Sequence, residues 1–258
     1  MNRYRTTVSG LALAGALLSG APGQALAGTG GELWGAATIE PGREGTVRVA
    51  GYTGPGLGAG SALTLTAPAP AVVTGTPLDA RGYRGAVASG GRSATYTFGG
   101  TPADEPWRGR GFPFVLAVPA DAVPGTRLTG CSMVLTDAAG VPRDRGSCAV
   151  TVGLPAPTLL RPQSGVPLTA RPETSGTAYP GAQVTVRDAL ENEVCSTTAG
   201  ADGDWSCVPA FPLAPGSGLL QATATLNGAG AVSDRIAVMV EGRLGDQPAH
   251  NEPNRPIG

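Results

Sequence analysis

The chain has 258 residues, a formal net charge of −1 and only 14% charged side chains. Its 41 glycines and 24 prolines exclude a helical bundle, because both residues interrupt helices. All 18 basic residues are arginines and are balanced by 19 acids, which argues against a nucleic-acid-binding protein. With 41% hydrophobic residues the chain can bury a core, and we expect a folded protein of strands and turns.

Residues 1–27 show the ordered features of a secretory signal peptide. Arg3 and Arg5 precede an apolar run over residues 8–18, and Ala25-Leu26-Ala27 offers a cleavage site. The alternative is a short buried helix. No later apolar stretch approaches the roughly 20 residues of a membrane span. We expect a mature chain that is secreted or held non-covalently at the cell surface, without insertion into the membrane.

Residues 28–153 contain short runs of alternating apolar and polar residues separated by Gly and Pro clusters. Alternation buries one side of a strand and exposes the other, so that Leu63 and Leu65 face away from Ala62 and Thr64. The expected strands are residues 46–52, 62–66, 71–74, 93–98, 112–118, 127–135 and 147–152. About seven strands at this spacing predict a β-sandwich.

Residues 154–157 are predicted to form a short, stiff linker to a second β-sandwich, over residues 158–241. Its expected strands are residues 158–160, 168–171, 183–188, 193–198, 204–208, 219–226 and 232–240. A helical turn is an alternative over residues 188–194. The tail, residues 242–258, lacks apolar periodicity and is expected to be disordered. The predicted fold class is all-β, with two tandem β-sandwiches.

The four cysteines are predicted to form two disulfides, one in each sandwich, as expected of an exported protein. Counting inward equally from Cys131 and Cys148 reaches the turn-rich segment around Ala139 and Gly140. The same count from Cys195 and Cys207 reaches Ala201, in AGADGD. Each pair is therefore expected to bridge the two strands of its own hairpin, and the second register sets Thr197 opposite Trp205. A zinc site of all four cysteines is the competing interpretation, but no C-x-x-C pair supports it.

The C-terminal half contains S-G-T-A at residues 175–178, P-G-A-Q-V-T-V at 180–186 and A-D-G-D-W-S at 201–206. In this order and spacing, the segments resemble the bacterial immunoglobulin-like repeats of surface and secreted proteins. The resemblance implies turns at Pro180-Gly181 and Asp202-Gly203, and Trp205 as the large core residue. The Cys195–Cys207 bridge departs from it, since many such repeats lack this bridge.

The N-terminal half resembles, more loosely, the β-sandwich modules found beside such repeats. The residues that carry this are L-T-A-P at 65–68 and V-P-A-D-A-V-P-G-T at 118–126. The resemblances imply an all-β protein of two tandem immunoglobulin-like β-sandwiches. They also imply non-catalytic adhesion, spacer or binding modules, although a fold alone does not determine function.

Residue usage also argues against an enzyme. The single His, His250, lies in the Pro-rich tail, where it cannot serve a Ser-His-Asp or His-zinc mechanism. Without Lys, Schiff-base chemistry and a phosphate-binding P-loop are impossible. Asp104 and Glu105 are adjacent and better explained as solvated residues than as a glycosidase pair. Asp202 and Asp204 could bind calcium, but the loop lacks the third acid and the downstream Glu of an EF-hand, so a hairpin turn with solvated acids explains them better. We expect no cofactor and no metal.

One segment is a candidate binding surface. Trp107 and Phe112 flank Arg108 and Arg110 in a Gly-rich stretch, so aromatic rings could stack on a sugar while the arginines pair with anionic groups. The alternative is that Trp107 caps the core and the arginines are merely solvated. Together these features predict a secreted, non-catalytic protein that mediates adhesion or binds a protein or polysaccharide of the cell envelope. A carbohydrate-binding accessory module is the alternative function.

Overall fold

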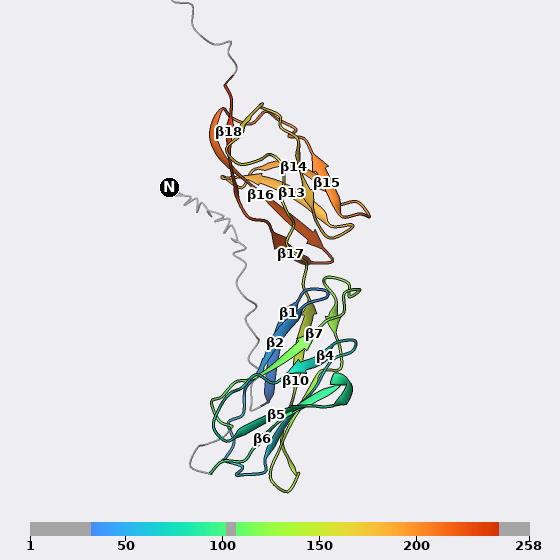
Figure 1. Ribbon diagram of the computed structural model, residues 1–258, viewed down its shortest axis with the longest axis vertical. Coiled ribbons are helices and arrows are strands. Elements are labelled where there is room, and N and C mark those ends of the chain that lie inside the picture. The colour runs from blue at the N-terminus through green and yellow to red at the C-terminus, as the bar shows by residue number, and fades with distance from the viewer. Residues whose placement is uncertain (1–31, 102–106, 243–258) are drawn as a thin grey trace, which may run out of the picture.

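The computed structural model describes residues 32–101 and 107–242. Within these ranges the protein is all-β, and a 3-10 turn over Ser89–Gly91 is its only helical element. Figure 1 shows two β-sandwiches stacked along the long axis of the molecule. The predicted signal peptide, Asp104, Glu105, His250 and residues 243–258 of the predicted tail lie outside the described residues.

The first sandwich comprises ten strands. They are β1 (Leu33–Ile39), β2 (Glu44–Val49), β3 (Ala62–Thr66), β4 (Val72–Gly75), β5 (Tyr83–Val87), β6 (Ser93–Phe98), β7 (Phe112–Ala117), β8 (Arg127–Leu128), β9 (Ser132–Thr136) and β10 (Pro142–Val152). One sheet has the order β1-β10-β9-β3-β6-β5, with β8 also paired to β10, and the opposite sheet is β2-β7-β4.

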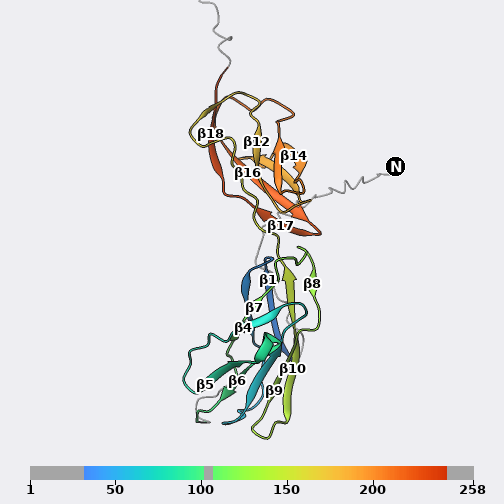
Figure 2. The same ribbon diagram turned by 45° about the vertical axis from the view of Figure 1, so that its right-hand side comes forward.

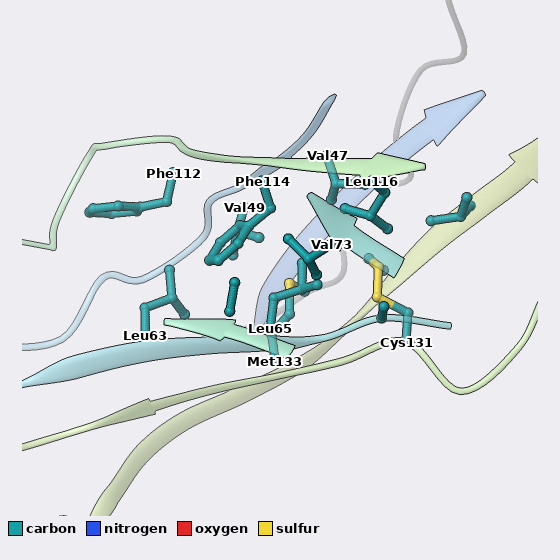
Figure 3. Packing of buried hydrophobic residues seen from close by; sticks show 14 of the residues in the cluster. Val47, Val49, Leu63, Leu65, Val73, Phe112, Phe114, Leu116, Cys131 and Met133 are labelled. Atoms are coloured by element: carbon teal, nitrogen blue, oxygen red, sulfur yellow. A yellow bond between two sulfur atoms is a disulfide. The ribbon is translucent and has the colours of Figure 1, made fainter. Parts of the chain in front are cut away.

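Apolar side chains from both sheets meet in the core of this sandwich. Figure 3 shows Val47 and Phe114, from the three-stranded sheet, above Leu65 and Met133, from the larger sheet. All four are almost completely buried. β2, β3 and β9 alternate buried and outward residues, which is the pattern that the sequence predicts for residues 62–66, whereas β7 also buries Pro113.

The second sandwich comprises eight strands. They are β11 (Pro167–Leu168), β12 (Thr174–Thr177), β13 (Gln183–Asp188), β14 (Glu193–Thr198), β15 (Asp204–Cys207), β16 (Gly216–Leu226), β17 (Ala229–Val232) and β18 (Ile236–Val240). The larger sheet has the order β11-β18-β16-β13-β14, with β17 paired to β16, and β12 pairs with β15 in the smaller sheet.

Several strand predictions need correction. β1, β5 and β12 were not predicted. One strand was predicted at 127–135 and one at 232–240, and the structure has two strands in each place. Residues 158–160 are not a strand, although Thr158 N and Leu160 N donate to carbonyls of β12. The alternative helix at 188–194 is a tight turn in which Asp188 Oδ1 accepts hydrogen bonds from the N–H groups of Leu190 and Asn192.

Both predicted disulfide pairs form, Cys131 with Cys148 and Cys195 with Cys207. The first extends the β9–β10 hairpin register, in which Met133 lies opposite Gly146. The second does not bridge a hairpin. Cys195 lies in β14, which pairs with β13, whereas Cys207 lies in β15, which pairs with β12. This disulfide therefore joins the two sheets of the second sandwich, and Trp205 lies opposite Gly176 rather than Thr197.

The two sandwiches have separate cores and meet at a small junction. The buried hydrophobic residues form two clusters, one from Leu33 to Val152 and one that begins at Leu154. The predicted linker thus contributes Leu154 to the second core. Asn227 Nδ2 donates a hydrogen bond to the Pro124 carbonyl at 3.1 Å across the junction. A Cβ on Gly125, at φ +84°, would lie 2.4 Å from Asn227 O, so only glycine permits this approach.

Candidate functional site

The structure divides the predicted binding segment between core and surface. Trp107 is 2% exposed, and its Nε1 donates a hydrogen bond to Ser61 Oγ at 2.7 Å. Its ring centroid lies 4.8 Å from that of Phe112 and 5.3 Å from that of Tyr83. Phe112 begins β7 and is equally buried. The expectation that Trp107 is free to stack on a ligand is therefore wrong, because its indole is part of the core.

Arg108 and Arg110 remain on the surface, where both contact other parts of the chain. Arg108 Nη2 donates hydrogen bonds to the carbonyls of Thr53 and Gly54 at 3.3 and 3.2 Å. The guanidinium carbon of Arg110 lies 5.5 Å from the ring centroid of Tyr83, a cation–π distance. The two arginines thus hold the loops around Trp107 in place.

An open hollow of about 590 Å³ lies beside Arg108, between the β2–β3 loop and the β9–β10 turn. Its lining residues are Tyr52, Gly54, Pro55, Gly56, Leu57, Asp137, Ala138, Ala139 and Arg143. Figure 2 shows the β9–β10 turn at the end of the first sandwich that points away from the second. The volume is within the range of small-molecule sites, but the lining is mostly backbone and small side chains.

Asp137 shapes one wall of this hollow. Its Oδ1 accepts hydrogen bonds from the N–H groups of Ala139 and Val141, both at 2.9 Å. Its Oδ2 pairs with Arg143, whose Nε lies at 2.7 Å. The Val141 N–H and the Arg143 guanidinium lower the pKa of the Asp137 carboxyl below its ordinary value. The carboxylate is thus a structural element of the turn.

Asp137→Asn should make the first sandwich less sensitive to acid. Because folding lowers the pKa of Asp137, the carboxylate stabilises the fold above its unfolded pKa of about 3.9 and loses this contribution as the pH falls through the folded pKa. We expect the melting temperature of the wild type to fall more steeply below about pH 4 than that of the variant. Thermal unfolding between pH 7 and pH 2 measures this, with Asp121→Asn as the control on another exposed loop. Parallel curves for wild type and Asp137→Asn would contradict the role.

The hollow is one candidate surface, and the outward side of β3, β6 and β9 is a second. Serine and threonine side chains lie there in adjacent rows. Thr66 pairs with Ser93 on one side and with Ser132 on the other. One step along, Thr64 pairs with Thr95, and their hydroxyls lie 2.8 Å apart. We call this surface the hydroxyl face, and it consists of Thr64, Thr66, Ser93, Thr95, Thr97, Ser132 and Thr136.

The row through Thr66 continues to an exposed tryptophan. The β9–β10 register that sets Met133 opposite Gly146 brings Ser147 beside Ser132, and Ser147 pairs with Trp34 of β1. Trp34 is 42% exposed. Neither Trp34 nor the hydroxyl face was predicted as a site. Alternation in ALTLT and SATYTF already placed their threonines on one side of each strand, but which strands are neighbours could not be read from it.

No metal site is evident in the described ranges, where no three His, Cys, Asp or Glu side chains gather as ion ligands. In the Asp202 turn, Oδ1 accepts the N–H of Asp204 at 3.1 Å, so this carboxylate caps the turn. Trp205 follows and is 4% exposed, as predicted for the core of the second sandwich. None of the helices among the described residues has the length and apolar character of a transmembrane segment.

Comparisons with known proteins are weak. No family model and no curated protein matches the chain. A biofilm-associated protein BSP domain is 17% identical over 81% of this chain and 29% of its own, with a TM-score of 0.28. The major pilin subunit of Bacillus cereus is 11% identical over 81% of this chain and 67% of its own, with a TM-score of 0.34. A tetra-tandem repeat from a large adhesion protein is 21% identical over 82% and 49%, with a TM-score of 0.30.

These similar structures come from bacterial adhesins and a pilin. The chain spans about three-tenths of the biofilm-associated protein and about half of the adhesion protein. Because every one of these TM-scores is below 0.5, the similarities assign neither a family nor a function to this chain. The assignment as two β-sandwiches rests on its own strand pairing.

Proposed function

We propose that this chain is a non-catalytic binding module that acts at the cell envelope or outside the cell. The observation that carries the proposal is the arrangement of the two sandwiches end to end, each crosslinked by its own disulfide. Disulfides suit an oxidising compartment, and the contact of Asn227 with Pro124 and Gly125 places one end of the second sandwich against one end of the first. This arrangement leaves the hollow beside Asp137 and the hydroxyl face, both on the first sandwich, open to a partner.

The perturbed titratable groups support a structural rather than a catalytic role. Catalytic sites commonly gather such groups in a cleft. Here Asp137 and Asp188 have lowered pKa values, because each carboxylate accepts hydrogen bonds within its own turn. Burial raises the pKa of Tyr96, whose hydroxyl donates to the Pro113 carbonyl at 2.6 Å. Burial also raises the pKa of Asp144 and of Tyr52, which lines the hollow together with Asp137. Each shift follows from burial or from a hydrogen bond that belongs to the fold.

A co-sedimentation assay with envelope fragments tests the proposal. The chain without residues 1–27, in oxidised form, should sediment with the fragments in a saturable manner. The same protein, reduced and heat-unfolded, is the control for non-specific adsorption, and it should show no saturable component. Sedimentation that rises linearly with protein concentration, or equally for folded and unfolded chain, would contradict a binding module. Pre-digesting the fragments with protease or with polysaccharide hydrolases then separates a protein partner from a glycan.

A further inference from the structure

We propose that the hydroxyl face binds an extended, neutral polysaccharide, with Trp34 stacking on a sugar ring at one end. This inference rests on the proposed function and names the ligand class of one of its surfaces. The face is an unpaired side of a sheet whose other side forms the core, and its residues are exposed or half-buried. In Figures 1 and 2 the second sandwich stacks on one end of the first and leaves this side uncovered.

The chemistry of the face matches a polymer of neutral sugars. None of the outward residues of β3, β6 and β9 is charged; they are serines and threonines apart from Ala62 and Val134. A hydroxyl both donates and accepts hydrogen bonds, as sugar hydroxyls do. Arginines border the face on both sides. Arg84 lies beside Thr97 and Arg145 beside Val134, and both add hydrogen-bond donors.

The spacing of the face suits a repeating ligand. Neighbouring strands lie about 4.8 Å apart, and outward residues on one strand recur every 6.6–6.8 Å or so. The rows Ser93–Thr66–Ser132 and Thr95–Thr64 therefore present hydroxyls at regular intervals. A polymer that repeats its own hydroxyls can engage several of them at once, so individually weak contacts add up to retention.

Trp34 supplies the apolar contact that hydroxyl rows lack. Its backbone is fixed by pairing with Ser147 on one side and by reciprocal hydrogen bonds with Ala50 on the other. The half-exposed indole continues the row through Thr66 and Ser132. An aromatic ring with an apolar face and a polar edge can pack against the C–H face of a sugar.

The same features disfavour the other macromolecules. The residues that carry most of the binding energy in protein interfaces are enriched in Trp, Tyr and Arg, and threonine is under-represented among them. The centre of this face consists of Thr64, Thr66 and Thr95. Anionic polymers require a basic surface whose affinity falls with salt. The bordering Arg84 and Arg145 are separated by β9, β3 and β6, which carry no charge on this side.

Retention on polysaccharide powders tests the inference. Cellulose and chitin are the neutral probes, and resin-bound polygalacturonate is the anionic counter-probe. The double variant Thr66→Val with Ser132→Ala removes two hydroxyls while keeping nearly the same shape. We expect its dissociation constant on the neutral probe that retains the wild type to rise about tenfold. Trp34→Ala should weaken retention by about tenfold or more.

The matched control is Thr46→Val, an exposed threonine on the outward side of β2 in the opposite sheet. It should bind like the wild type, and all variants should keep the wild-type melting temperature to within a few degrees. Wild-type protein that ignores both neutral probes, binds only the anionic one, or binds equally in all variants overturns the inference. If the variants still sediment with envelope fragments like the wild type, the binding module stands and the hydroxyl face is not its site. If the wild type does not sediment either, the proposed function itself fails.

Discussion

Replacing Trp107 with alanine should destabilise the first sandwich by about 3–5 kcal/mol. The indole is 2% exposed, and it packs against the rings of Tyr83 and Phe112. Its removal leaves a large cavity and deprives Ser61 Oγ, which is also buried, of its hydrogen bond from Nε1. A loss of this size is a substantial share of the total stability of a domain.

Thermal and urea unfolding of the variant measure this loss. Trp34→Ala is the matched control, because it removes the same side chain from a position that is 42% exposed. Its free energy of unfolding should change by less than about 1 kcal/mol. Trp205→Ala should destabilise the second sandwich about as much as Trp107→Ala destabilises the first. If Trp107→Ala unfolds like the wild type, Trp107 is not a core residue, and the stretch from Trp107 to Phe112 is again a candidate surface site.

Replacing Cys195 and Cys207 together with alanine should destabilise the second sandwich by about 3 kcal/mol. The two cysteines are 12 residues apart, and closing a loop of roughly this size lowers the entropy of the unfolded chain by that amount. The bridge also connects β14 to β15, which belong to different sheets. Thr174 Oγ1 packs 3.2 Å from both sulfurs, so the substitution also perturbs a buried polar contact.

Urea unfolding followed by tryptophan fluorescence reports on this change, since Trp205 lies in the core of the second sandwich. The control is the pair Cys131→Ala and Cys148→Ala, which should lower the stability of the first sandwich and leave the Trp205 transition in place. A Cys195/Cys207 variant whose second sandwich unfolds at the wild-type urea concentration would contradict the role of the bridge between the sheets.

Local sequence determined several strands completely. β3, β6, β13 and β14 have the predicted bounds, because each is a short run of alternating residues between turn signals. The β9–β10 register also followed from sequence, since the Cys131–Cys148 pair and the turn between them constrain one another. These features depend on residues close together in the chain.

Strands without a clear local alternation were not predictable, because a distant partner determines them. β1 is largely small residues, and it is a strand because it runs parallel to β10, more than a hundred residues later; a Cβ on Gly146 would lie 1.7 Å from Leu33 O. β12 likewise exists through its pairing with β15. That pairing draws β15 into the smaller sheet, which is why the predicted hairpin with β14 does not form although the Asp202-Gly203 turn does.

The candidate surfaces also depend partly on local sequence and partly on packing between distant segments. Sequence alternation determined that Thr64 and Thr95 point away from the core, but only the order β9-β3-β6 brings their hydroxyls together. Trp107 lies outside any strand, as the sequence indicated, yet the side chain is buried because Phe112 and Tyr83 surround it. The two-residue period of a strand is a local property, whereas the neighbour of a strand and the burial of a loop depend on packing between segments far apart in the chain.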